Sequence, residues 1–192
     1  MLAEGQATRL IPVRVADGPP TGLVPALQFV APTPARVLGL LPQQLSARVP
    51  QDRLADVAAN LPRSLIVIGA RHLTEAVAVR PNVVAVTAMP DAATQDAATQ
   101  VVPIARADVA VPLTAREPLL IVSARRAGAE PEDIAVARVL ALAARIVAVR
   151  PDLDGAGLKA HLLSFAKPLP PATPQPTSHG WLPDVARIHW LD

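Results

Sequence analysis

The chain contains no cysteine among its 192 residues. This absence excludes disulfide bonds, thiolate zinc sites and a cysteine nucleophile. Aromatic residues are also scarce, since there are two phenylalanines, two tryptophans and no tyrosine. The hydrophobic fraction is nevertheless 51%. The core must therefore be built from alanine, valine, leucine and isoleucine.

Clustered positive charge and long apolar runs are missing as well. Eighteen lysines and arginines face sixteen acidic residues, for a net charge of +2, and the longest basic run is Arg125 and Arg126. A nucleic-acid interface needs a basic cluster with aromatic stacking partners, so none is predicted. No run of about 18 apolar residues is present, so no membrane span is predicted. The first residues lack the features of a signal peptide, which leaves the cytoplasm as the default location.

Short aliphatic runs alternate along the chain with helix-like segments. The runs are continuous rather than alternating, which is typical of strands covered on both faces in a parallel sheet. This order predicts an α/β fold with right-handed crossovers. Strands are predicted over residues 9–15, 36–41, 64–70, 82–88, 107–111 and 119–123, and helices over residues 22–31, 50–61, 131–149 and 155–166.

Proline is abundant, with 22 residues, and it marks the predicted domain organisation. Residues 1–167 are predicted to form the α/β domain. Residues 168–179 are predicted to be an extended tether, because five prolines fall between positions 168 and 178. Residues 180–192 are predicted to form a tail element that packs back on the domain. Residues 91–100 repeat the pentapeptide DAATQ and are predicted to be a surface loop.

The predicted helix over residues 131–149 carries the clearest local signals. Pro131 suits a first helical turn, and Glu132 and Asp133 place negative charge where the helix dipole favours it. Only Arg138 and Arg145 interrupt the apolar sequence beyond them. A helix that is apolar nearly all round is predicted to be buried.

The segment from Gly155 to Ala160 matches the dinucleotide-binding pattern G-x-G-x-x-A. That pattern requires a strand that ends at the first glycine, so that the pyrophosphate meets the helix N-terminus. Here a long helix and a Pro-Asp turn precede the glycine, which favours an ordinary helix start with Asp154 as its N-cap. A nucleotide-binding α/β domain stays open as a further interpretation, although no phosphate loop follows any predicted strand.

The histidines and serines form no recognisable catalytic or metal-binding motif. No two histidines are four residues apart on one helix, so no metal or other cofactor is predicted. None of the serines lies in a G-x-S-x-G elbow. The histidines are His72, His161, His179 and His189, and the serines are Ser46, Ser64, Ser123, Ser164 and Ser178.

Several segments, in order, resemble the subtilisin-like serine peptidases, the subtilase family. The similar stretches are ATRLIPVRV, SLIVIGARH, RPNVVAVTA, ADVAVP, VRPDL with GLKAHLL, and GWLPDVA. They begin at residues 7, 64, 80, 107, 149, 157 and 180, and together extend over nearly the whole chain. The resemblance implies a three-layer, mostly parallel sheet with helices on both faces that lacks the N-terminal part of the family fold.

The catalytic positions depart from this family. Its members combine an aspartate, a histidine in an H-G-T motif and a serine in a G-T-S motif. This chain starts just after the H-G-T position, and the G-T-S position falls on Pro131, Glu132 and Asp133. Asp133 thus occupies the nucleophile position, and the oxyanion-hole asparagine falls on about His72, next to Arg71. The resemblance therefore implies an inactive relative with no catalytic residues.

Two functions remain open on these grounds. The leading expectation is a non-catalytic domain that acts as a binding or scaffolding module. The missing first strands would leave an open sheet edge near the segment from Arg9 to Val15, and a protein partner or a second copy is expected to pair there. The alternative is the C-terminal portion of a split or truncated peptidase that another chain completes.

Overall fold

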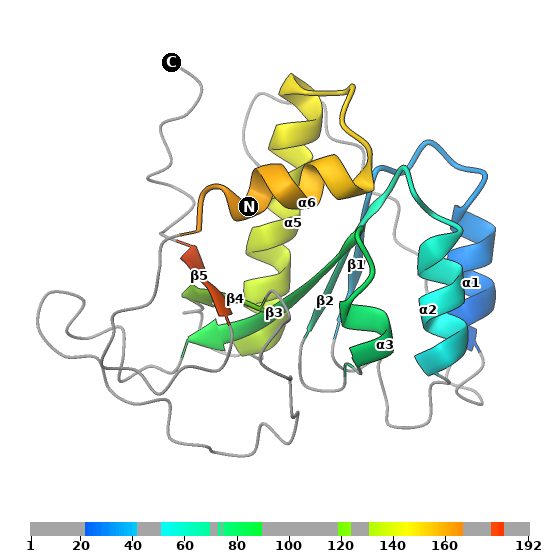
Figure 1. Cartoon of the computed structure of the whole chain (residues 1–192), viewed down its shortest axis with the longest axis horizontal. Coiled ribbons are helices and arrows are strands. Elements are labelled where there is room, and N and C mark those ends of the chain that lie inside the picture. Colours follow the sequence, from blue (N-terminus) through cyan, green and yellow to red (C-terminus); the bar gives the residue numbers. More distant parts are fainter. Residues whose placement is uncertain are drawn as a thin grey trace, which may run out of the picture.

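The computed structural model describes residues 22–41, 51–69, 73, 75–89, 119–123, 131–166 and 178–182. These residues form one parallel sheet with helices on both sides (Figure 1). The elements in chain order are α1 (Leu23–Val30), β1 (Val37–Leu40), α2 (Gln51–Ala59), β2 (Leu65–Gly69), α3 (Glu75–Ala78), β3 (Val83–Met89), β4 (Leu119–Ser123), α5 (Pro131–Val149), α6 (Gly155–Leu163) and β5 (Ser178–Leu182).

The five described strands are all parallel and lie in the order β1-β2-β3-β4-β5. The predicted α/β class is therefore confirmed. Four predicted strands and four predicted helices are present, with ends that differ from the predicted ones by three residues or fewer. The strands predicted over residues 9–15 and 107–111 lie outside the described residues. Neither α3 nor β5 was predicted, and β5 begins at Ser178, inside the predicted tether.

Two apolar clusters hold the layers together. Alternate residues of a strand point to opposite faces of the sheet. Ile66 and Ile68 of β2 accordingly pack with α1, α2 and α3 in the first cluster. Leu65 and Val67 pack with α5 and α6 in the second cluster. Every residue of β2 is buried as a result, and the described part of the chain has three layers (Figure 1).

Helix α5 has the predicted ends, Pro131 and Val149, but it is buried along one face only. Its buried positions recur every three or four residues, and Ala137 and Ala148 are exposed. The prediction that this helix is buried therefore holds for one face only. Two of its three exposed residues are alanines, which gain little from leaving water. The buried residues are Glu132, Ala135, Val136, Val139, Leu142, Ala143 and Ile146.

The connections between strands do not share one hand. Helices α2 and α3 link β1, β2 and β3 on one face, whereas α5 and α6 stand between β4 and β5 on the other face. The strand order advances in the same direction throughout. Crossovers on opposite faces of a sheet that advances in one direction have opposite hands. The predicted right-handed crossovers, which were inferred from the order of the first strands, therefore cannot hold for both sets of connections.

Candidate functional site

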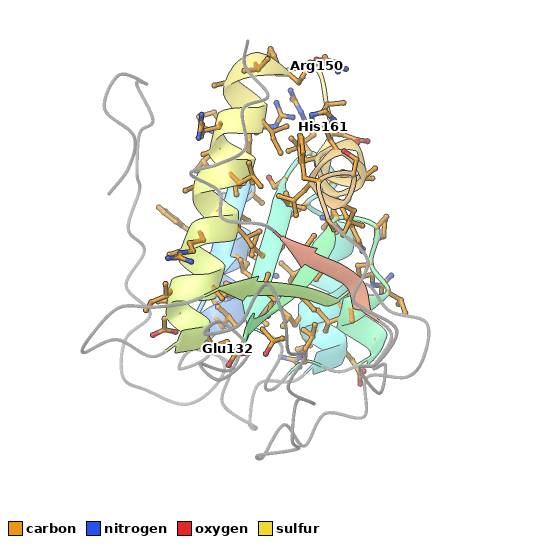
Figure 2. All side chains as sticks on the ribbon, turned by 90° about the vertical axis from the view of Figure 1, so that its left-hand side faces the viewer. Glu132, Arg150 and His161 are labelled. Carbon is orange, nitrogen blue, oxygen red and sulfur yellow. The ribbon has the colours of Figure 1, made fainter. Side chains whose placement is uncertain are left out.

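The start of α5 lies at the edge of the sheet where ligands usually bind in α/β folds, the carboxyl ends of the strands. The chain leaving α5 contacts Arg36, which immediately precedes β1, so the end of α5 lies at the amino edge. Its start therefore lies at the carboxyl edge. Figure 2 shows Glu132 at one end of α5 and Arg150 at the other.

Two carboxylates occupy the first turn of α5. Glu132 is buried, with 6% of its surface exposed, and Asp133 is half-buried. The partial positive charge at a helix N-terminus stabilises negative charge at this place. Asp133 therefore lies in the first helical turn, as predicted. His72, the residue predicted at the oxyanion position, lies outside the described residues, as does Arg71.

The described serine hydroxyls bind backbone carbonyls. The Ser64 hydroxyl, on a residue that is 6% exposed, donates to the carbonyl of Ala35 at 2.8 Å. The Ser164 hydroxyl donates to the carbonyl of His161 at 2.6 Å. The His161 ring meets Phe165 edge to face, with centroids 5.3 Å apart. Ser164 and His161 are thus neighbours, but the hydroxyl is directed at the main chain and the imidazole at an apolar ring.

The other predicted candidates are more widely scattered. Ser123 is the last residue of β4, and Ser178 and His179 open β5. Ser46 and His189 lie outside the described residues. Where side chains are described, no group of three or more histidine, aspartate or glutamate residues is placed to hold a metal ion. None of the described helices is both long and apolar enough to cross a membrane.

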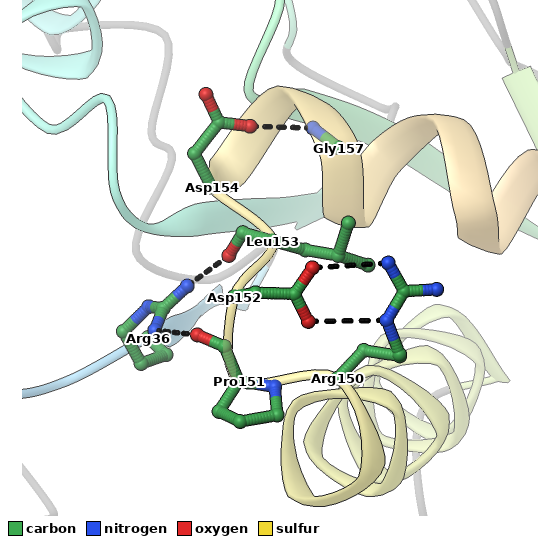
Figure 3. Close-up of polar contacts among 7 residues, drawn as sticks. All are labelled: Arg36, Arg150, Pro151, Asp152, Leu153, Asp154 and Gly157. Carbon is green, nitrogen blue, oxygen red and sulfur yellow. Dashed lines mark hydrogen bonds and ion pairs between the residues drawn. The ribbon is translucent and has the colours of Figure 1, made fainter.

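Among the described residues, a polar cluster lies at the amino edge of the sheet and centres on Arg36 (Figure 3). Its Nε donates to the carbonyl of Arg63 at 2.9 Å, and its Nη1 to that of Pro151 at 3.0 Å. Its Nη2 donates to the carbonyl of Leu153. One guanidinium thereby joins the start of β1, the turn before β2 and the link between α5 and α6. These three hydrogen bonds hold separate segments of the fold together.

A buried amide performs a similar task beside it. Asn82 is 2% exposed, and its Nδ2 donates to the carbonyls of Ala58 and Leu61 at 2.9 Å and to that of Ser64 at 3.2 Å. Two of these carbonyls belong to the end of α2 and the residues just after it. Buried carbonyls need donors, and Asn82 supplies them at the point where α2 turns toward β2.

The glycine motif of α6 belongs to the same amino edge. Gly155 donates its N–H to the carbonyl of Pro62 at 2.8 Å. A Cβ at Gly155 would lie 2.4 Å from the Ser64 carbonyl oxygen and 2.8 Å from Asn82 Cβ. The Asp154 carboxylate accepts from the Gly157 N–H at 2.7 Å, so Asp154 is the N-cap, as predicted. Gly155 is therefore required for the close approach of α6 to the sheet.

An exposed ion pair completes the link between α5 and α6. Arg150 donates from Nε and Nη2 to the two carboxylate oxygens of Asp152, each at 3.0 Å (Figure 3). The hydrogen bonds from Arg150 lower the pKa of the Asp152 carboxyl below its usual value, and the same contact raises the pKa of Arg150.

Arg36 and Asn82 were not singled out from the sequence. Their roles depend on carbonyl groups supplied by segments up to 117 residues away, and no local pattern signals such partners. Comparison with protein-family models, with curated proteins and with solved structures finds no match for this chain.

Proposed function

We propose that this chain is a non-catalytic relative of the subtilisin-like serine peptidases that acts as a binding or scaffolding module. The observation that carries the proposal is the acidic first turn of α5, where Asp133 takes the position that the resemblance assigns to the nucleophilic serine. The three-layer α/β architecture and the order of the similar segments support it.

The chemistry of this turn favours a structural role. A serine peptidase needs a hydroxyl, a base that removes its proton and amide donors for the oxyanion. A carboxylate at position 133 forms no productive acyl-enzyme. It instead gains about 0.3–1 kcal/mol from the helix dipole. Glu132, beside it, adds a second negative charge to the same turn.

The proposed binding surface is an edge of the sheet. Among the described strands, β1 and β5 stand at the two ends. An edge strand presents amide groups that can pair with a further strand. We assign the binding role to the edge on the β1 side, with a protein segment or a second copy as the partner. The segment from Arg9 to Val15, near which this edge was expected, lies outside the described residues.

Labelling with a fluorophosphonate probe tests the proposed lack of catalysis. The full-length chain is expected to remain unlabelled and to leave casein intact, with an active serine peptidase as the positive control. The variant Asp133→Ser is expected to remain unlabelled as well, because a hydroxyl without a neighbouring base is a weak nucleophile. Labelling of any serine in the unmodified chain would refute the proposal.

The alternative, a peptidase completed by another chain, predicts proteolysis of casein when this chain is mixed with a segment that carries the missing D-x-G and H-G-T motifs. It is disfavoured because position 133 would still lack a hydroxyl.

Sedimentation at micromolar concentration tests self-association separately. A compact 20.0 kDa monomer at every concentration would argue against the second copy as the partner.

A further inference from the structure

The bond between Asp154 and Gly155 is one of two Asp-Gly sequences in the chain, and the other joins Asp17 to Gly18. An aspartate followed by glycine isomerises readily when the backbone is free to move. The glycine nitrogen has no neighbouring Cβ to shield it, and the glycine backbone rotates freely. This nitrogen can attack the aspartate Cγ and close a five-membered succinimide ring. Asp154 therefore carries a reactive group at the point where α6 begins.

The fold holds the reacting groups apart. The Gly155 N–H must lose its proton before the nitrogen attacks, and it donates to the Pro62 carbonyl at 2.8 Å. The Asp154 Oδ1 atom accepts from the Gly157 N–H at 2.7 Å, which directs the carboxylate along the start of the helix (Figure 3). Ring closure also requires Cβ and the Gly155 nitrogen to be nearly eclipsed, whereas the Asp154 ψ angle of −176° is staggered.

Close neighbours also restrict Gly155 while α6 stays on the sheet. The residue is buried. A Cβ at this position would lie 2.4 Å from the Ser64 carbonyl oxygen and 2.8 Å from Asn82 Cβ. A rearranged backbone has no room on this side. Isomerisation at Asp154 therefore requires the start of α6 to leave the sheet.

We propose that Asp154 is a site of spontaneous isomerisation that the folded chain protects and the unfolded chain exposes. In the unfolded chain, the Gly155 nitrogen bonds to Asp154 Cγ, and its proton leaves with the carboxyl hydroxyl as water. Solvent water then opens the ring. Opening at Cγ restores aspartate, whereas opening at the former main-chain carbonyl breaks its bond to nitrogen and leaves isoaspartate. The mass is unchanged, and no enzyme or oxidant takes part.

Isoaspartate at position 154 removes the features that dock α6. The main chain now runs through Cβ, so it gains one carbon just before the tightly packed Gly155. The former carboxylate, which capped the Gly157 N–H, becomes the peptide carbonyl. The former peptide carbonyl, which accepts from the Leu158 N–H at 2.9 Å, becomes a carboxylate. A chain that isomerises while unfolded therefore does not regain the native fold, and Asp154 acts as a chemical record of unfolding.

Arg36 controls how often the site opens. It donates to the carbonyls of Pro151 and Leu153, in the link that leads to Asp154. Isomerisation is far slower than local opening of a helix end, so its rate follows the equilibrium population of the open form. Loss of the contacts from Arg36 raises that population and with it the rate of isomerisation. The inference goes beyond the proposed binding function and does not depend on it.

Peptide mapping of the full-length chain tests the protection. The chain is kept at neutral pH in buffer or in guanidinium chloride, and isoaspartate is separated from aspartate in the tryptic peptide from Ile146 to Lys159. In guanidinium chloride, Asp154 and Asp17 are expected to isomerise at similar rates. In buffer, Asp154 is expected to react at least about thirtyfold more slowly, because two hydrogen bonds must open together. Equal rates at Asp154 in buffer and in denaturant would overturn the proposal.

Two matched variants test the role of Arg36. Arg36→Met is expected to raise the rate at Asp154 in buffer about fivefold, the effect of one hydrogen bond. Arg36→Lys keeps one donor and is expected to give a smaller increase, which keeps the test open if the first variant does not fold. Arg150→Gln breaks only the exposed ion pair with Asp152 and is expected to leave the rate unchanged. Equal rates in all three variants would contradict the role of Arg36.

Refolding tests the consequence. The chain is held in guanidinium chloride until part of Asp154 has isomerised and is then diluted into buffer. The folded monomer, collected by size exclusion, is expected to be depleted in isoaspartate at position 154. Asp154→Glu, whose longer side chain would have to close a six-membered ring, is expected to refold with the same yield before and after this treatment. Equal isoaspartate at position 154 in the folded and unfolded fractions would overturn the proposed record of unfolding.

Discussion

Replacement of Gly155 by alanine is expected to destabilise the fold strongly, because the new methyl group has no space. It would lie 2.4 Å from the Ser64 carbonyl oxygen, 2.8 Å from Asn82 Cβ and 2.9 Å from the Pro62 carbonyl oxygen. Two of these atoms are main chain and the third is the first carbon of a buried side chain. None of them is the free end of a flexible side chain, so the start of α6 must move instead.

The expected loss can be worked out from these contacts. Overpacking of a tight site costs about 1–3 kcal/mol. Moving α6 also weakens the hydrogen bond from the Gly155 N–H to Pro62, which contributes about 0.5–1.5 kcal/mol. The better helix propensity of alanine returns up to about 1 kcal/mol. These terms leave a net loss of about 0.5–4.5 kcal/mol. The middle of that range, about 2–3 kcal/mol, lowers the Tm of a chain of this length by about 4–12 °C.

Gly157→Ala is the matched control, two residues further along the same helix. Its Cβ would lie 3.2 Å from the Asp154 Oδ1 atom, which the N-cap hydrogen bond holds, and 3.2 Å from Leu153 Cδ2, the end of a side chain that can shift. This variant is expected to lose clearly less than Gly155→Ala, because its contacts are longer and alanine is the better helix former. Urea denaturation followed by circular dichroism gives both free energies of unfolding. An unchanged Gly155→Ala variant, or equal losses in the two variants, would refute the steric argument.

Three further substitutions or titrations test the amino-edge contacts. Arg36→Met removes the guanidinium that donates to three carbonyls. It is expected to lower the free energy of unfolding, measured by urea denaturation, by about 2–3 kcal/mol. A loss below about 0.5 kcal/mol would contradict the role assigned to Arg36. Asn82→Asp sets a carboxylate against three carbonyls and is expected to cost more than about 3 kcal/mol at neutral pH, more than Asn82→Ala in the same assay. The pKa of Asp152 is lowered in the folded chain. The stabilisation of the folded state by the ionised Asp152 carboxylate is therefore present above the usual aspartate pKa, and it is lost as the pH falls through the lowered value. An NMR titration of the Asp152 carboxyl at low and high salt checks this, and a pKa at or above the usual value would contradict the ion pair.

The regular elements were largely predictable because their signals are local. The strands β1 to β4 are continuous aliphatic runs. Such runs are typical of strands in a sheet that is covered on both faces, because the side chains on each face are apolar. Helix α5 was predicted to the residue, since Pro131 suits a first turn and Pro151 prevents continuation. Asp154 signalled the start of α6 in the same way.

The elements that escaped prediction depend on distant partners. Helix α3 has only four residues, too few to show a helical period in the sequence. Strand β5, SHGWL, follows a proline-rich stretch, and its place in the sheet comes from pairing with β4 rather than from its own composition. The partial exposure of α5 was missed because composition does not distinguish alanines that face the core from those that do not. At the candidate site, Asp133 was located by resemblance, and its position at a helix start follows from Pro131.

The division of the core between the two ends of the chain bears on synthesis. The described residues between 22 and 89 form α1 to α3 and β1 to β3, and the three helices cover one face of these strands. The other face, with Leu65, Val67, Val84 and Val86, is covered by α5 and α6 from residues 131–166. During synthesis, the first three strands leave the ribosome before α5 and α6. Their apolar face is then exposed to solvent, where it can bind chaperones or aggregate. A frameshift or stop codon ahead of α5 would leave that surface permanently bare.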